Sequence, residues 1–308
     1  MDKKRLIIPI IFLIICISII SIFSYKKEMY EKSPTLSILM MHVVCDEMPE
    51  DKSLSGLYIT TDMLDRYLEY FKEQNYNVVT LDEAYNIIKN NVPVENNKLL
   101  VYTFDDGYMD NYTKGFPILK KHNAKFNLNI IARYTDEQYF NYLTWEQVNE
   151  MNESGLMELG NHTYDSHIYT EDYKGDSVPI LKALLPGESK EQRRERILSD
   201  LKKADEYISQ RGNYGKKINV MAYPYGVPPR DMQGEIADTL DYYIELMVTP
   251  GVNRNINDFT GLHRFVVDGF ESPSRLEQRM EVYKGFNFLN KKSRSLRELV
   301  KQLIYFNF

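Results

Sequence analysis

The chain has 308 residues, of which 43% are hydrophobic and 27% are charged, a composition typical of a folded globular protein. Its formal net charge is -6, and its basic residues are scattered along the chain rather than clustered. Because phosphate recognition requires clustered lysine and arginine, we expect no binding of nucleic acid. The length allows one large domain or two modest ones.

The N-terminal segment departs from this average composition. Residues 6–23 are almost wholly apolar, and about 18 such residues is close to the minimum that crosses a bilayer. Three basic residues at positions 3–5 precede it, which predicts a cytoplasmic segment 1–5 and an exported remainder. A cleaved signal peptide is the alternative, but Ser-Ile-Phe-Ser at 21–24 is a poor cleavage site. We therefore expect an uncleaved transmembrane anchor, a linker at 24–35 and a domain outside the cell membrane.

Apolar runs and helical patterns then alternate along the chain. Short apolar runs bounded by turn residues predict buried strands. They lie at 37–41, 77–79, 99–104, 125–131, 157–160, 218–222, 244–248 and 265–267. Repeated strand–helix units indicate an α/β fold with a parallel sheet and outer helices. About seven such units suit a distorted (β/α)7-type barrel.

Capping residues mark the expected helix starts, three of them within boxes of the Ser/Thr-x-x-Glu/Gln type. These starts lie at Thr61, Thr80, Thr144 and Ser189. Residues 170–186 show no pattern and are expected to form a long surface loop. Apolar residues recur at helical spacing after residue 295, which predicts a C-terminal amphipathic helix at 287–308. The catalytic domain is then assigned to 36–286.

Polar residues follow directly after three of the predicted strands, at the end where catalytic groups gather in a barrel. The first cluster is Thr103-Phe104-Asp105-Asp106-Gly107-Tyr108. Because side chains alternate along a strand, Asp105 and Asp106 should point in different directions. One of them can then bind a metal while the other faces a substrate. A helix cap or a turn is the alternative explanation for such a pair taken alone.

The second cluster runs from Gly160 to His167 and contains two of the five histidines in the chain. His162 and His167 follow a strand and can converge on one ion if the segment turns as a loop or a helix start. Neutral imidazole is a standard ligand for zinc and related metals. A pair of ordinary surface histidines is the alternative. Combined with an aspartate, the pair would leave coordination positions open, as catalytic metal sites do.

Together these clusters resemble two motifs of the polysaccharide deacetylase family, also called the NodB-homology or carbohydrate esterase family 4 group. Residues 103–108 match its first motif and residues 162–167 its second. The resemblance extends over roughly 37–286, with the order of helices and strands also agreeing. It implies a hydrolase that removes N-acetyl groups from a polysaccharide.

The same resemblance implies roles for individual residues. Asp105 would be the catalytic base, and the metal would be held by Asp106, His162 and His167. Zinc is the first choice for this metal, and cobalt or nickel would also suit an Asp-His-His site.

The third cluster is Ala222-Tyr223-Pro224-Tyr225-Gly226. It resembles the family's third motif, in which the residue after the proline offers its backbone N–H to the oxyanion. Tyr225 would take that part, and such a donor is worth about 3 kcal/mol in other hydrolases. A plain Pro-Gly turn is the alternative. The family commonly has an arginine two residues before this proline, where this chain has Ala222. Another residue must then orient the base, and Arg264 is the candidate.

The general acid is expected to be a histidine, and two histidines compete for the role. His42 ends the strand at 37–41, whereas His263 precedes the strand at 265–267. The segment before His42 resembles the family's late leucine-rich motif, as if moved to the front by circular permutation. The poly-N-acetylglucosamine deacetylase branch of the family looks like this, so we favour His42. For either residue, a histidine that is only hydrogen-bonded at a strand end is the alternative.

These expectations combine into a membrane-anchored, metal-dependent N-deacetylase that releases acetate. Its substrate would be a cell-surface or extracellular polysaccharide of the poly-N-acetylglucosamine or peptidoglycan type, as found in biofilms and cell walls. A catalytically silent carbohydrate-binding wall protein is one alternative, but the chain retains all three metal-ligand residues. A small-molecule amidase of the same fold is another, although a membrane tether suits an immobile polymer better.

Overall fold

The computed structural model describes residues 33–289, except 255 and 257. Its centre is a curled sheet with the strand order β11-β10-β7-β6-β5-β1-β12, in which β13 also pairs with β1 and β4 with β5. All of these pairs are parallel except β1 with β12. The strands are β1 (Thr35–Met41), β4 (Asn77–Val78), β5 (Lys98–Asp106), β6 (Phe126–Ile130), β7 (Met157–Asn161), β10 (Val220–Ala222), β11 (Ile244–Leu246), β12 (Asn253–Arg254) and β13 (Phe265–Val266).

The predicted parallel α/β architecture is therefore confirmed as a curled parallel-stranded sheet. The strand β11 lies at one end of the sheet order, yet Leu246 bridges in parallel to Leu262, just before β13. Because β13 pairs with β1, this bridge brings the two sides of the curled sheet towards each other. Such curling is the geometry of a (β/α) barrel.

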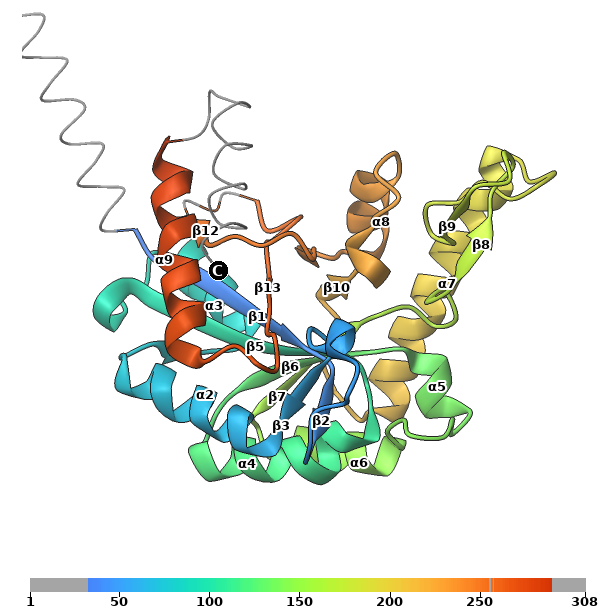
Figure 1. Cartoon of the computed structure of the whole chain (residues 1–308). Coiled ribbons are helices and arrows are strands. Elements are labelled where there is room, and N and C mark those ends of the chain that lie inside the picture. Colours follow the sequence, from blue (N-terminus) through green and yellow to red (C-terminus); the bar gives the residue numbers. More distant parts are fainter. Residues whose placement is uncertain (1–32, 255, 257, 290–308) are drawn as a thin grey trace, which may run out of the picture.

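Helices surround the sheet; the apolar residues of the helix at 81–89 pack at its inner side and those of the others at its outer side. They are α2 (Thr61–Glu73), α3 (Leu81–Lys89), α4 (Phe116–His122), α5 (Ala132–Asp136), α6 (Trp145–Glu153), α7 (Lys190–Arg211), α8 (Gln233–Leu240) and α9 (Pro273–Leu289). In Figure 1, α2, α4 and α6 lie along one side of the sheet, while α8 and the hairpin of β8 (Tyr169–Glu171) and β9 (Ser177–Pro179) project at the top. The predicted capping boxes at Thr80, Thr144 and Ser189 are all present. The cap of α2 is Thr60 rather than Thr61, because Thr60 is still extended and its hydroxyl accepts from the Met63 N–H.

Alternate strand positions separate into two buried clusters. Leu99 and Val101 of β5 belong to a cluster inside the curled sheet. Leu100 and Tyr102 belong to a cluster that also contains apolar side chains of α2, α4, α6 and α7. Removing such apolar surface from water contributes about 25 cal/mol per Å² to folding. Because side chains alternate between the two faces of a strand, Asp105 lies on the same face as Leu99 and Val101. The candidate base is therefore on the inner side of the sheet.

Two short strand pairs and one helix lie outside the predicted pattern. The expected loop 170–186 contains an antiparallel hairpin of β8 (Tyr169–Glu171) and β9 (Ser177–Pro179), whose backbone pairing the sequence pattern did not indicate. A further pair, β2 (Val43–Cys45) with β3 (Tyr58–Thr60), was also not expected. The helix α9 occupies 273–289, within and beyond the end of the predicted catalytic domain.

The predicted anchor at 6–23 and most of the predicted C-terminal helix at 287–308 lie outside the described residues. Among the helices of the described part, none has the length and apolar character needed to span a bilayer. The assigned domain boundaries therefore stay predictions.

Candidate functional site

Three potential metal ligands converge at the carboxyl ends of neighbouring strands. Asp106 ends β5, His162 follows β7, and His167 lies five residues further along the loop. Their ligand atoms all lie within 4.8 Å of one another. The Nε2 atoms of His162 and His167 are 3.2 and 3.4 Å from Asp106 Oδ1, and the two ring centroids are 4.9 Å apart. The structure thus brings the predicted Asp-His-His set together.

The hydrogen bonding of His162 supports a cation at this position. Its Nδ1 lies 2.6 Å from the carbonyl oxygen of Ala222, which can only accept, so Nδ1 must carry a proton. Nε2 then faces Asp106 Oδ1, a buried oxygen that accepts no hydrogen bond of good geometry from any described residue. Burial alone would lower the pKa of His162, but Asp106 and Asp105 outweigh it and raise the pKa, so either a second proton on the ring or a metal cation lies between these two atoms. A carbonyl that fixes the tautomer in this way is also the usual support of a metal-binding histidine.

His167 is available as a neutral ligand. Burial and, next, the neighbouring His162 lower its pKa to about 4, despite the opposing charge of Asp106. Its imidazole therefore carries a free lone pair at neutral pH. The ring is 4.6 Å from that of Tyr225, whose hydroxyl donates to the His167 carbonyl at 3.1 Å.

Asp105, the predicted base, is held by Arg264, the predicted orienting residue. Arg264 NH1 donates to Asp105 Oδ1 at 2.9 Å, and NH2 lies 2.8 Å from Oδ2. Burial by itself would raise the pKa of Asp105, but the charge of Arg264 and then that of His162 outweigh it and lower the pKa. Arg264 is fully buried and is fixed further by Met247 and Thr103, which accept from its other hydrogen-bonding groups. Asp105 is therefore an ionised carboxylate in a defined orientation.

Three non-glycine residues of this site have a left-handed backbone conformation. Asp106, Thr163 and Tyr225 have φ values of 75°, 79° and 57°. Positive φ is uncommon outside glycine and is least favourable for a β-branched residue such as threonine. Strained residues of this kind tend to cluster where function requires them. The turn at Asp106 also brings its carboxylate to the histidines beside Asp105. The two carboxylates therefore lie at one site, with Asp106 facing the histidines and Asp105 facing Arg264.

His42 lies beside this site. Met41 is paired in register with Phe104, so His42 is the neighbour of Asp105 on the next strand. The pKa of His42 is lowered, first by burial, and both Asp105 and Asp106 act on it in the opposite direction. Its Nδ1 is buried without a hydrogen bond from any described residue. Its backbone carbonyl accepts from the Asn111 amide at 2.6 Å, which holds the turn after β1.

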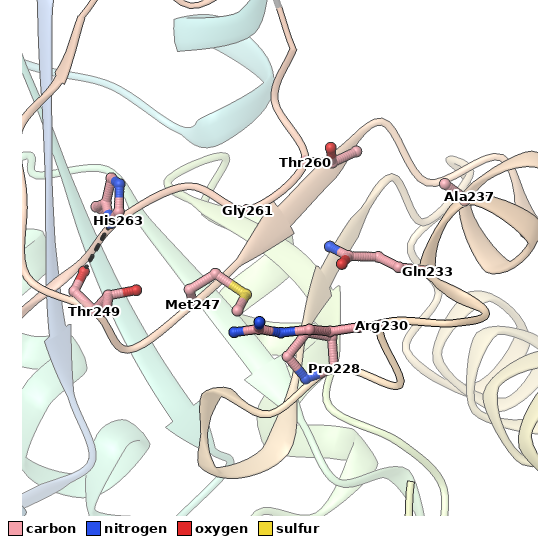
Figure 2. A pocket seen from close by; sticks show the side chains of 10 residues that line it. Pro228, Arg230, Gln233, Ala237, Met247, Thr249, Thr260, Gly261 and His263 are labelled. Carbon is pink, nitrogen blue, oxygen red and sulfur yellow. Dashed lines mark hydrogen bonds between the residues drawn. The ribbon is translucent and has the colours of Figure 1, made fainter. Parts of the chain in front are cut away.

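His263, the competing histidine, faces a different part of the molecule. It is exposed, and its Nδ1 lies 3.2 Å from the Thr249 carbonyl oxygen. Figure 2 shows it at one side of a cavity of about 560 Å³ between the start of α8 and the segment that leads to β13. The residues around this cavity include Arg230 and Gln233 but none of the predicted metal ligands.

Sequence reasoning missed one residue in contact with the candidate base. Asn129 of β6 is fully buried, and its Nδ2 donates to Asp105 Oδ1 at 2.7 Å. The available signal was the alternation in Phe126-Asn127-Leu128-Asn129-Ile130, which places two amides on the inner face of an otherwise apolar strand. That pattern indicated a strand but did not reveal which partners the amides would meet.

Residues 93–243 match the family model described as polysaccharide deacetylase. This range is shorter than the 37–286 over which the sequence resembles the family. It contains the Asp pair, the His pair and Tyr225, whereas His42 and Arg264 lie outside it.

Two curated proteins named poly-beta-1,6-N-acetyl-D-glucosamine N-deacetylase are similar to this chain. The protein from Escherichia coli (strain K12) is 28% identical over 207 residues, which cover 60% of this chain and 30% of that protein. The protein from Staphylococcus epidermidis is 27% identical over 214 residues, which cover 66% of this chain and 68% of that protein. The chain thus spans less than a third of the length of the Escherichia coli relative.

Solved structures show the same fold. The deacetylase PplD of Streptococcus pyogenes, solved in complex with acetate, superimposes with a TM-score of 0.67 at 27% identity. The similarity covers 80% of this chain and 99% of PplD. IcaB from Ammonifex degensii gives a TM-score of 0.62 at 26% identity, covering 80% of this chain and 97% of IcaB.

Proposed function

Because this chain belongs to the polysaccharide deacetylase family, we propose that it hydrolyses N-acetyl groups of a poly-N-acetylglucosamine-type polysaccharide and releases acetate. The names of the relatives from Escherichia coli and Staphylococcus epidermidis support this substrate class. The observation that carries the proposal is the convergence of Asp106, His162 and His167 beside the Asp105–Arg264 pair. A metal-ligand set next to an ionised, oriented carboxylate can catalyse amide hydrolysis, because the metal activates water and the carboxylate accepts its proton.

Asp106, His162 and His167 would hold one divalent metal ion. One carboxylate and two imidazoles suit zinc, and also cobalt or nickel, and three protein ligands leave positions open for reactants. When bound, the metal would polarise the acetyl carbonyl and lower the pKa of a water from about 16 towards about 7.

The protein's own groups would move the protons. Asp105 accepts a proton from the attacking water while the water oxygen bonds to the acetyl carbon. The Tyr225 backbone N–H donates to the oxyanion that forms. His42 is neutral at rest because burial lowers its pKa, and the negative charge that develops in the reaction raises its proton affinity again. His42 takes up the proton that Asp105 accepted from the water and passes it to the leaving nitrogen as the C–N bond breaks, giving acetate and an amino sugar.

We also propose that residues 6–23 anchor the protein in the cell membrane, with the catalytic domain outside the cell. The support is the apolar segment and the basic residues before it. A tether of this kind would keep the enzyme near a polymer at the cell surface.

Acetate release from a panel of purified substrates tests the proposal. The panel comprises poly-N-acetylglucosamine, peptidoglycan and small N-acetyl amides, each with and without a chelator, and Asp105→Asn serves as the inactive control. We expect release from poly-N-acetylglucosamine that stops with chelator and returns with added zinc. Polymer binding without acetate release would instead identify a silent carbohydrate-binding protein. Release from small amides alone would identify an amidase, and either result overturns the proposal.

A further inference from the structure

Three inward-facing positions form a row across neighbouring strands. Asp105 of β5 is paired with Asn129 of β6, and Asn129 is paired with Gly160 of β7. Residues paired in register on parallel strands project from the same side of the sheet. All three are buried; Asn129 is 0% exposed. The amide of Asn129 therefore lies between the candidate base Asp105 and Gly160.

The two oxygens of Asp105 have different surroundings. Oδ1 accepts two hydrogen bonds, from Asn129 Nδ2 at 2.7 Å and from Arg264 NH1 at 2.9 Å. Oδ2 has one close contact with a hydrogen-bonding group of the described residues, Arg264 NH2 at 2.8 Å. With two donors already on Oδ1, the lone pair that remains for a further proton belongs to Oδ2.

Gly160 provides the space that the Asn129 amide occupies. A Cβ atom at residue 160 would lie 2.1 Å from Asn129 Oδ1 and 3.2 Å from its Cγ. The first distance is far below normal contact and the second is tight, so a side chain at residue 160 would push the amide away. Asn129 Oδ1 itself is buried and accepts no hydrogen bond from the described residues. The amide is thus held by its Nδ2 donation to Asp105, since turning it over would set oxygen against oxygen.

We propose that Asn129 is a positioning residue that occupies Oδ1 of Asp105 and so makes Oδ2 the proton acceptor, with Gly160 providing the necessary space. The inference rests on the proposed function and names the atom that acts in it. A proton passes from the attacking water to Asp105 Oδ2, and the water oxygen bonds to the acetyl carbon. Asn129 exchanges no proton and acts only through the orientation of Asp105.

The strand β6 offers a matched control for this role. Asn127 lies two residues before Asn129, is also 0% exposed, and donates to the buried carboxylate of Glu158. Replacing either asparagine by alanine removes one buried amide from the same strand face and leaves one carboxylate with fewer donors. Asn127 also accepts from the Leu81 N–H, so Asn127→Ala should lose at least as much stability as Asn129→Ala, while only Asn129→Ala changes the surroundings of Asp105.

The experiment compares Asn129→Ala with Asn127→Ala in the full chain, using acetate release from the polymer that the wild type hydrolyses. For Asn129→Ala we expect kcat to fall by about 10- to 100-fold, the effect of one lost hydrogen bond to a charged group. KM and the metal content should stay as in the wild type. Asn127→Ala should keep kcat within about twofold, with thermal unfolding measured for both variants.

Two further variants separate positioning from general damage. Gly160→Ala should lower kcat as Asn129→Ala does, because its methyl group displaces the amide. The double variant should be no worse than Asn129→Ala, since the methyl group then fills the space that the amide left. Asn129→Asp should lose more than Asn129→Ala, because it sets a second carboxylate against Asp105.

The outcomes distinguish the inference from the function on which it depends. If the wild type releases no acetate from any polymer, the proposed function and the inference are both overturned. If the wild type is active but Asn129→Ala keeps its kcat, the inference alone is overturned. Equal kcat losses in the Asn127 and Asn129 variants, or additive losses in the double variant, would overturn it as well.

Discussion

The guanidinium of Arg264 lies against both carboxylate oxygens of Asp105, although 159 residues separate the two in the sequence. Arg264 is 0% exposed and Asp105 2%, so the pair is shielded from water. Breaking a buried ion pair on one side leaves the other charge uncompensated, which typically costs about 3–5 kcal/mol. Removing either partner should therefore destabilise the fold as well as change the state of the candidate base.

Replacing Arg264 should affect both properties. We expect Arg264→Met to lower the free energy of unfolding by about 3 kcal/mol, because Asp105 is left buried without its partner, and to lower kcat, because Asp105 loses the group that orients it. Arg264→Lys should recover part of the stability but little of the activity, since an ammonium group cannot contact two oxygens as a planar guanidinium does. Denaturant unfolding and acetate release measure the two effects. Wild-type kcat in Arg264→Met would contradict the orienting role.

The ligand assignment predicts the metal content of the protein. Purified wild type should contain about one divalent ion, and His162→Ala should lose it, because three ligands are the minimum of a catalytic site. A variant with both His162 and His167 replaced should retain none. Elemental analysis after dialysis provides the measurement, and His122→Ala, which alters a histidine bound to Asp65, is the control. One bound metal ion per chain in the double variant would contradict the ligand assignment.

Much of the architecture was predictable because it depends on local patterns. The apolar run 99–104 forms the core of β5, and the capping boxes at Thr80, Thr144 and Ser189 begin helices as expected. The hairpin β8–β9 was missed because its pairing depends on backbone hydrogen bonds that side-chain periodicity does not encode. Helix α9 was not predicted, although Leu276, Met280 and Tyr283 recur at helical spacing and pack in or against the core.

The site was predictable in its residues but not in its contacts. Asp106, His162 and His167 were found from motifs, and Arg264 was chosen because Ala222 stands where an arginine was expected. The positive φ of Asp106 could not be read from strand alternation, since it depends on the turn that follows β5. The contact of Asn129 with Asp105 depends on the register between β5 and β6, which the sequence alone does not specify.

A buried glutamate at the other end of β7 predicts a pH dependence of stability. Glu158 accepts from the Leu81 and Asp82 N–H groups at the start of α3 and from the Asn127 amide. Burial, and then the charge of Asp82, raise its pKa from 4.5 to about 7. The folded protein thus binds this proton more tightly than the unfolded chain does. The contribution of protonated Glu158 to the free energy of unfolding is complete below about pH 4.5, and it is lost as the pH rises through about 7.

The variant Glu158→Gln tests this dependence, because glutamine stays neutral. Between about pH 5 and pH 8, the free energy of unfolding of the wild type should fall relative to that of the variant. Denaturant unfolding at several pH values measures the difference. A constant difference over this range would show that the pKa of Glu158 is not raised.

The proposed anchor predicts the position of the chain in intact cells. Protease added from outside should cleave the domain, and the mature N-terminus should still be Met1 or Asp2, because residues 6–23 remain attached. A variant with the lysines at positions 3 and 4 replaced should insert less uniformly, since these charges set the orientation. N-terminal sequencing and protease protection provide the measurements. A new N-terminus near Ser24 would favour a cleaved signal peptide.

The final prediction separates His42 from His263 as the general acid. A general acid must come within about 3 Å of the leaving nitrogen. His42 follows β1 next to Asp105 in register, and the charges of Asp105 and Asp106 both act on it. His263 instead lines the cavity next to α8, where its Nδ1 is engaged with the Thr249 carbonyl. We therefore expect His42→Ala to lower kcat by about 10²- to 10⁴-fold, the usual share of an acid–base group.

His263→Ala is the matched control, because it removes an imidazole from the residue next to Arg264 without touching the metal ligands. Its kcat should stay within a few fold of the wild type, while both variants keep their metal. A substrate with a better leaving group than an amine sharpens the comparison: an aryl acetate needs little protonation of its leaving oxygen. His42→Ala should therefore retain far more activity on an aryl acetate than on the polymer. Loss of polymer activity in His263→Ala alone would show that the acid comes from the late strand and that the permuted arrangement is wrong.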